Sequence, residues 1–113
     1  MMYIMVRSKK GQTDQQRLTE IFKSELFGPY FKANPEMVQN WPLKCKAIAG
    51  DLTLDGLGLS PESQQILVNE VHIIINCAAS VNFDDPIRDA LNINYFGCKR
   101  LLKYAHNSKV IEC

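Results

Sequence analysis

The stretch "IINCAASVNF", residues 74–83, decides the fold prediction. The β-branched residues around its start are typical of a buried strand, which we place at residues 72–76. The residues that follow are small: Cys77, Ala78, Ala79 and Ser80. A strand that ends at a binding crevice would carry small residues there, because a flat ligand could then lie against the backbone. A turn that merely tolerates small residues explains them equally well.

Apolar runs and helical patterns alternate along the rest of the chain. The strand candidates are Tyr3 to Val6, Lys44 to Ala49, His72 to Asn76 and Val110 to Cys113. Between them, Thr13 with Gln16 forms a capping-box pattern, and Ser60 followed by Pro61 is typical of a helix start. The longest helix is predicted from Asp85 and Pro86 onward, whereas residues 28–43 are predicted to be irregular, with one helical turn at most near Pro35 to Gln39.

This alternation predicts an α/β fold, in which a parallel sheet is covered by helices on both faces. The chain has 113 residues, enough for one small domain. Its content of 46% hydrophobic and 22% charged residues is typical of a globular protein. The net charge of +1 gives no field that would gather nucleic acid or an anionic membrane. The opening "MMYIMV" is too short to span a membrane and lacks the features of a signal peptide, which favours an intracellular protein.

The cysteines lie at positions 45, 77, 98 and 113 and include no C-x-x-C pair. Separate reduced thiols fit this spacing better than a disulfide framework or a metal site, so we predict no metal.

In a parallel α/β sheet, ligands bind beyond the carboxyl ends of the strands. Arg7 follows the first strand candidate, with Lys9 and Lys10 beside it, and a guanidinium group suits a phosphate such as the 2′-phosphate of NADP. An ordinary basic surface corner is the alternative. Asp51, at the end of the next strand candidate, could accept a hydrogen bond from an adenine amino group, although it would also suit a simple turn.

Three stretches together resemble the NADP-binding domain of the fatty acyl-CoA reductases, a branch of the extended short-chain dehydrogenase/reductases with male-sterility-type domains. They are "VRSKKGQTDQQRLTEIF", "IAGDLTLDGLGLS" and "VHIIINCAASVNFDDPIRDALNINYFGCKRLL", in collinear order over nearly the whole chain. The block "CAASVNFDDP" with the downstream "NINYFG" is the most specific part. The resemblance implies a Rossmann-like sheet, NADP(H) as cofactor and long-chain acyl-CoA as the substrate of the full-length protein, which is reduced to fatty aldehyde or alcohol.

The resemblance also implies roles for individual residues. Arg7, Lys9 and Lys10 would lie near the 2′-phosphate, and Asp51 and Leu52 near adenine. The four small residues Cys77, Ala78, Ala79 and Ser80 would lie along the ribose and pyrophosphate.

Asn94 lies on the apolar stripe of the long helix by helical spacing, so we expect a buried amide that must find hydrogen-bond partners. It could bridge backbone groups or a water molecule. The resemblance implies a supporting catalytic role, in which this asparagine holds a water linked to the catalytic lysine. Cys98 stands where relatives often have threonine, a small departure.

Tyr95 and Lys99 spell Y-x-x-x-K, the spacing of a tyrosine proton donor with its lysine. In the resembled family that pair lies on the helix after the fifth strand, whereas Tyr95 lies on the helix after the fourth. A pattern of two fixed letters arises easily by chance, so we do not assign these two residues as catalysts.

The chain lacks both G-x-x-G-x-x-G and G-x-G-x-x-G. It is expected to start at the family's second strand and to end within the fifth, before the catalytic serine, tyrosine and lysine. Residues 1–113 would then form a partial NAD(P)-binding Rossmann-like domain, a fragment without the first strand and the glycine-rich loop. Alternatives are another extended short-chain reductase acting on a nucleotide-sugar, a thioester-reductase module, or a catalytically inactive binding fragment.

A Rossmann strand order of 3-2-1-4-5-6 places that first strand between Tyr3 to Val6 and His72 to Asn76. We expect these two segments either to pair directly in parallel or to be separated by displacement of the amino-terminal strand. Lys44 to Ala49 should pair with Tyr3 to Val6, and Val110 to Cys113 with His72 to Asn76.

Overall fold

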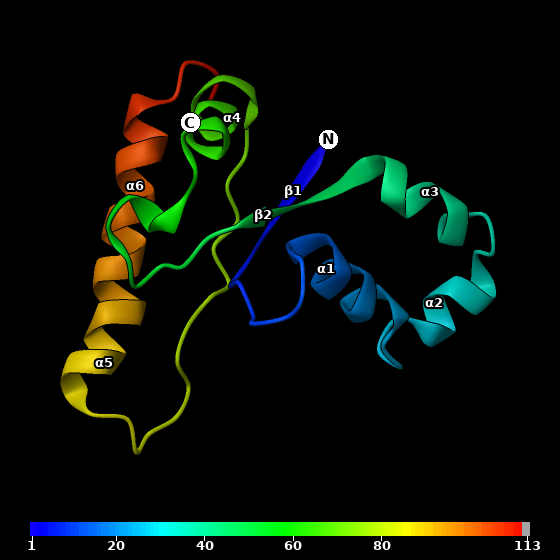
Figure 1. Ribbon diagram of the computed structural model, residues 1–113, viewed down its shortest axis with the longest axis horizontal. Helices are drawn as coiled ribbons and strands as arrows, with labels where there is room; N and C mark the ends of the chain where they lie inside the picture. The colour runs from blue at the N-terminus through cyan, green and yellow to red at the C-terminus, as the bar shows by residue number, and fades with distance from the viewer. Residues whose placement is uncertain (112–113) are drawn as a thin grey trace. The chain divides into compact units, whose positions relative to one another are not determined.

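The computed structural model describes residues 1–111, which belong to two compact units, one from Met1 to Gly50 and one that begins at Asp51 (Figure 1). The first unit contains β1 (Met2–Val6), α1 (Asp14–Lys23), α2 (Gly28–Ala33), α3 (Met37–Lys44) and β2 (Cys45–Ala49). The second contains the 3-10 turn η1 (Asp55–Gly58), α4 (Pro61–Glu70), α5 (Ile87–Leu91), the π-helical segment η2 (Asn92–Gly97) and α6 (Cys98–Asn107).

The two strands of the first unit form a parallel sheet. Their register runs from Met2 opposite Cys45 to Val6 opposite Ala49. The prediction that Lys44 to Ala49 pairs with Tyr3 to Val6 is therefore confirmed, and with it the α/β class and the parallel arrangement. Parallel strands need a crossover connection, which here is made by the three helices between β1 and β2.

Helix α1 begins at the predicted capping box. The Thr13 hydroxyl accepts a hydrogen bond from the Gln16 backbone at 3.2 Å, and the Gln16 side chain accepts one from the Thr13 backbone at 2.8 Å. Leu18 on this helix is completely buried. At the helix start, Gln15 Oε1 accepts a hydrogen bond from the Ala47 backbone of β2 at 3.2 Å. The helix therefore supplies both the apolar cover of the sheet and a partner for a strand amide.

The prediction of an irregular segment at residues 28–43 is wrong, because α2 and α3 occupy most of it. Pro29 lies in the first turn of α2, where a missing N–H costs no helical hydrogen bond. Aromatic packing then holds both helices to α1: the Phe22 ring centroid lies 6.4 Å from that of Phe31 in α2, and the Phe22 ring stacks on Trp41 in α3 at 4.3 Å between centroids. Tertiary packing of this kind outweighs the local turn signals that prolines give.

The second unit follows its predicted helix starts. The Ser60 hydroxyl caps α4 by accepting a hydrogen bond from the Ser63 backbone at 3.2 Å, with Pro61 in the first turn. The long helix predicted after Asp85 is present as α5, η2 and α6, which follow one another without a break (Figure 1). Its middle part is π-helical, a feature that often marks functional sites.

The predicted strand at residues 72–76 is wrong. These residues belong to no strand or helix, and Ile73 and Ile75 are 77% and 81% exposed. The predicted parallel pairing of this segment with Tyr3 to Val6 is therefore wrong as well. The physical reason is that a strand needs a neighbour for its hydrogen bonds, and none of the described segments pairs with this one.

The last predicted strand, Val110 to Cys113, falls partly on residues 112 and 113, which lie outside the described residues. Val110 and Ile111 belong to no strand, so their predicted pairing with residues 72–76 is not formed. Within residues 1–111, no helix combines the length and the apolar character that crossing a membrane requires.

Candidate functional site

The loop of small residues that follows residues 72–76 is attached to the long helix of the second unit. The amide of Asn94 binds the Ser80 backbone twice: its Oδ1 accepts a hydrogen bond from Ser80 N at 2.8 Å, and its Nδ2 donates one to Ser80 O at 3.0 Å. The structure thus brings together two of the residues that the sequence predicted. Asn94 is exposed, contrary to the expectation of a buried amide, but both of its polar atoms are paired with backbone.

Asn76 attaches the other end of the loop. Its Nδ2 donates a hydrogen bond to Cys98 Sγ at 3.0 Å, and its Oδ1 accepts one from Ala78 N at 3.2 Å. Asn94 and Cys98 are four residues apart, one turn along the same helix. The loop is therefore fixed at both ends, while the side chains of Cys77, Ala78 and Ala79 between them are exposed. This arrangement leaves the loop backbone accessible to a ligand.

Ser80 is also the start of a polar turn that leads into α5. The Ser80 hydroxyl donates a short hydrogen bond to Asp85 Oδ2, and Asn82 Nδ2 donates to Asp85 Oδ1 at 2.7 Å. Sequence reasoning assigned Asp85 only to the start of a helix and missed Asn76 altogether as a site residue. A signal was present: short polar side chains at positions 76, 80, 82 and 85 are the types that hydrogen-bond nearby backbone and order loops.

Asp51 and Leu52, predicted to lie near adenine, form the start of the second unit. Asp51 Oδ1 accepts hydrogen bonds from Thr53 N at 2.8 Å and from Thr53 Oγ1 at 2.7 Å. Leu52 is buried, and a Cβ on Gly97 would come within 3.1 Å of the Leu52 Cβ. The glycine of the "NINYFG" block thus allows a close approach, which places Leu52 against the same π-helical segment that carries Asn94.

The basic residues Arg7, Lys9 and Lys10 follow β1 in the first unit, and all three are exposed. The Arg7 carbonyl accepts a short hydrogen bond from the Arg17 side chain of α1. A tight turn follows, in which Gln12 N donates to Lys9 O at 3.1 Å and Gly11 has φ of +79°. In the described part of the chain, no carboxylate pairs with these three cations, so their charge is available to an anion.

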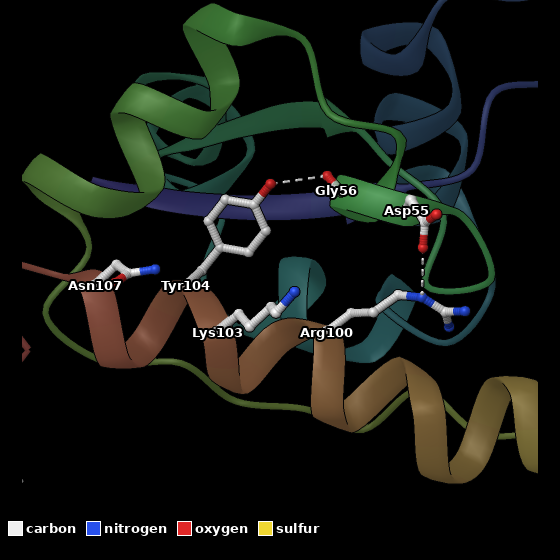
Figure 2. A pocket seen from close by; sticks show the side chains of 6 residues that line it. All are labelled: Asp55, Gly56, Arg100, Lys103, Tyr104 and Asn107. Atoms are coloured by element: carbon white, nitrogen blue, oxygen red, sulfur yellow. Dashed lines mark hydrogen bonds and ion pairs between the residues drawn. The ribbon is translucent and has the colours of Figure 1, made fainter.

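A separate hollow of about 430 Å³ lies beside α6, lined by Asp55, Gly56, Arg100, Lys103, Tyr104 and Asn107 (Figure 2). The Tyr104 hydroxyl donates to Gly56 O at 3.0 Å, and Arg100 Nε lies 3.6 Å from Asp55 Oδ1. Figure 2 shows both interactions joining α6 to the loop after Leu52. Burial raises the pKa of the Tyr104 hydroxyl above its ordinary value of 10.0.

All three nitrogens of the Arg100 guanidinium have a partner in this junction. Besides Asp55, it donates to Leu52 O at 2.9 Å, to Asn92 O at 3.3 Å and to Asn92 Oδ1 at 3.0 Å. The residues around the hollow therefore serve to join α6 to residues 52–56. The loop at residues 76–80 is the better candidate for ligand binding.

Tyr95 and Lys99, the Y-x-x-x-K pair, lie on this helix as well. The Tyr95 ring is 57% exposed and packs edge-on against Phe96 at 5.0 Å. Neither residue forms part of the loop attachments. Cys45, Cys77 and Cys98 are free thiols, and within residues 1–111 no group of three or more His, Cys, Asp or Glu side chains could hold a metal ion.

Parallel α/β architecture and a small-residue loop attached to a helix are features of nucleotide-cofactor-binding proteins. Residues 1–113 match the NAD-binding family model described as "Male sterility protein", and the chain belongs to this family. The family is defined by a Rossmann-like domain for a nicotinamide cofactor.

Several curated proteins are similar to the chain. "Fatty acyl-CoA reductase 1" of Mus musculus is 36% identical over 110 residues, which cover 97% of this chain and 21% of the relative. "Fatty acyl-CoA reductase 2" of Homo sapiens is 37% identical with the same coverage, and "Fatty acyl-CoA reductase wat" of Drosophila melanogaster is 31% identical over 103 residues, 91% of this chain and 19% of the relative. The chain thus spans about a fifth of the length of these relatives.

Proposed function

We propose that this chain is the cofactor-binding part of an NADPH-dependent fatty acyl-CoA reductase. The observation that carries the proposal is the loop of residues 76–80, held to one helix by Asn76 and Asn94 with small, exposed residues between the two attachments. Names of relatives that match nearly the whole chain support the activity, in which a long-chain acyl-CoA is reduced to a fatty aldehyde or alcohol.

The residues present fit such a cofactor. Small side chains at positions 77–79 allow a ribose and pyrophosphate to approach the backbone closely. Arg7, Lys9 and Lys10 would meet the 2′-phosphate that distinguishes NADPH from NADH, since a guanidinium offers phosphate a bidentate fork. Asp51 and Leu52 would lie at the adenine end.

When bound, NADPH supplies the hydride, and the protein's share is binding and orientation. Asn94 would act in a supporting role by holding the Ser80 peptide through both of its amide atoms. Proton donation by a serine, tyrosine and lysine set belongs to the family pattern outside the positions matched here, and Tyr95 with Lys99 is not assigned to it. We therefore place residues 1–113 within one NAD(P)-binding domain and assign them cofactor binding.

The alternatives differ in what the chain should bind. A thioester-reductase module or another extended short-chain reductase would share the cofactor but reduce a different substrate. The third alternative is a catalytically inactive binding fragment. It is supported by the sequence of the chain, which contains no G-x-x-G-x-x-G or G-x-G-x-x-G motif to bind a pyrophosphate.

Amide NMR spectra of the ¹⁵N-labelled chain, titrated in parallel with NADPH and NADH, test the proposal. We expect weak binding, in the millimolar range, because the pyrophosphate cradle is absent from the sequence and the remaining contacts are few charged hydrogen bonds. The amides of residues 78–80 should shift with both dinucleotides, and those of Arg7, Lys9 and Lys10 with NADPH alone. Shifts confined to the hollow around Tyr104, or no shifts at all, would contradict the proposal.

A further inference from the structure

Asp85 occupies the centre of the polar turn between the loop and α5. Both of its carboxylate oxygens accept hydrogen bonds, Oδ2 from the Ser80 hydroxyl and Oδ1 from Asn82 Nδ2. Asn82 N in turn donates to Ser80 Oγ at 3.4 Å. The neighbouring Asp84 differs: only its backbone N–H is bonded, to Asn82 Oδ1 at 3.3 Å, and within residues 1–111 its carboxylate has no partner.

Ser80 is consequently held at three polar groups. Asn94 binds its backbone N–H and its carbonyl, and Asp85 binds its hydroxyl. A carboxylate can only accept, so the hydroxyl hydrogen of Ser80 must point at Asp85. The hydroxyl is therefore not available as a donor to a ligand, and the loop presents its backbone instead. Fixing the last residue of the loop on two sides also limits the orientations of the peptide groups at residues 77–79.

From these contacts we infer that Asp85 is a positioning residue for the cofactor: it holds the Ser80 side chain so that the backbone of residues 77–80 keeps the conformation that receives the dinucleotide. The inference rests on the proposed function and adds to it a residue that does not touch the ligand. It also assigns Ser80 a role through its backbone, with its hydroxyl serving only as the attachment to Asp85.

A double-mutant cycle on the 113-residue chain separates this role from direct contact. Asp85→Ala and Ser80→Ala each remove the same attachment, so each should weaken NADPH binding in the NMR titration by about fivefold, the worth of one hydrogen bond. The double variant should be no weaker than either single one, because residues that act through one interaction are not additive. Asp84→Ala is the matched control and should bind NADPH like the unchanged chain.

Two further measurements test whether the bond to Ser80 is what links Asp85 to binding. Asp85→Asn keeps an oxygen that can accept from Ser80, so it should recover binding relative to Asp85→Ala. In the free protein, hydrogen exchange at the Ser80 amide, which donates to Asn94 Oδ1, should become about tenfold faster in Asp85→Ala, while amides of α6 keep their rates.

Each outcome decides a different point. If Asp85→Ala accelerates Ser80 exchange but leaves NADPH binding unchanged, Asp85 is a structural residue and the inference is overturned while the proposed function stands. If Ser80→Ala and Asp85→Ala add in full, the Ser80 hydroxyl contacts the ligand and the inference fails. If the unchanged chain shows no NADPH-dependent shift, the proposed function and the inference fall together.

Discussion

The strands of the first unit and the segment at residues 72–76 are all short runs rich in apolar residues, yet only the strands have a hydrogen-bonded backbone. β1 and β2 form a parallel ladder of five residues each, with Val6 and Ile48 buried. Residues 72–76 have no regular secondary structure, and in the described part of the chain their backbone makes no hydrogen bond to other backbone.

The difference shows what a strand depends on. A helix satisfies its backbone groups within its own sequence, whereas a strand takes its partners from another segment. The "HIII" run has strong strand character, but the chain is attached only beyond its end, where the Asn76 side chain donates to Cys98 and the Ser80 backbone donates to the Asn94 side chain. The sequence pattern therefore gives a segment its strand propensity, but a strand forms only where a neighbouring segment can pair with it.

The largest contrast in stability should separate Leu18 from Ile75. Leu18 on α1 is completely buried beside the sheet, so Leu18→Ala should lower the free energy of unfolding by about 2 to 5 kcal/mol through lost burial and a cavity. Ile75 is 81% exposed, and Ile75→Ala should change stability by less than about 0.5 kcal/mol. Urea unfolding followed by circular dichroism measures both; equal losses would mean that residues 72–76 are packed as tightly as the sheet.

A second contrast concerns ligand recognition at the end of β1 and in the loop after residue 76. In a longer protein with the strand, glycine-rich loop and helix of a fatty acyl-CoA reductase fused ahead of residue 1, Arg7→Ala should weaken NADPH by about 1.5 to 3 kcal/mol, the worth of a charged hydrogen bond. NADH should be affected much less, because it lacks the 2′-phosphate.

Asn94→Ala in the same protein provides the control for Arg7. The loop that Asn94 holds is proposed to meet the part common to both dinucleotides, so this change should weaken NADPH and NADH alike. Isothermal titration with each cofactor gives the four comparisons. Equal losses of NADPH and NADH on changing Arg7 would show that it does not read the phosphate.

Local interactions explain which elements the sequence could predict. The starts of α1 and α4 follow from Thr13, Gln16 and Ser60, whose side chains bond to backbone three residues away. By contrast, α2 and α3 depend on aromatic packing of Phe22 against Trp41, nineteen positions along the chain, and prolines in the sequence pointed the other way. The prediction of a strand at residues 72–76 was wrong for the same reason, because the partner that a strand needs lies in another part of the chain.

The candidate site shows the same division. Ser80 and Asn94 could be named individually from the "CAASVNFDDP" and "NINYFG" blocks, but their two hydrogen bonds to each other join positions fourteen residues apart. Asn76 was overlooked because its partner, Cys98, was noted only as a departure from the family pattern. Asp85 was taken for a helix start, and its carboxylate proved to hold the loop instead.

Helix caps in the two units offer a finer comparison. Thr13 caps α1 with a reciprocal pair of bonds, whereas Ser60 caps α4 with one bond to the Ser63 backbone. Thr13→Ala should therefore cost about 1 kcal/mol of unfolding free energy and Ser60→Ala about half as much, within the usual range for caps. Thermal and urea unfolding of both variants measure the difference. A larger loss for Ser60 would mean that α4 contributes more to the stability of the chain than the helix over the sheet does.

The smallest effect on stability and the most direct test of the unpaired segment come from Ile75→Lys. Residues 71–77, "VHIIINC", combine β-branched residues with no proline and no full charge, a composition that promotes strand pairing between chains when it is exposed. We expect the unchanged chain to self-associate as its concentration rises. A lysine at position 75 should suppress this association, because like charges in adjacent copies repel, while the free energy of unfolding changes by less than about 0.5 kcal/mol.

Light scattering across a concentration series, with Lys46→Ile in β2 as the reverse change on a paired strand, measures the effect. If Ile75→Lys leaves association unchanged, residues 72–76 do not mediate pairing between chains. The lack of a strand partner would then not be what distinguishes this segment from the sheet.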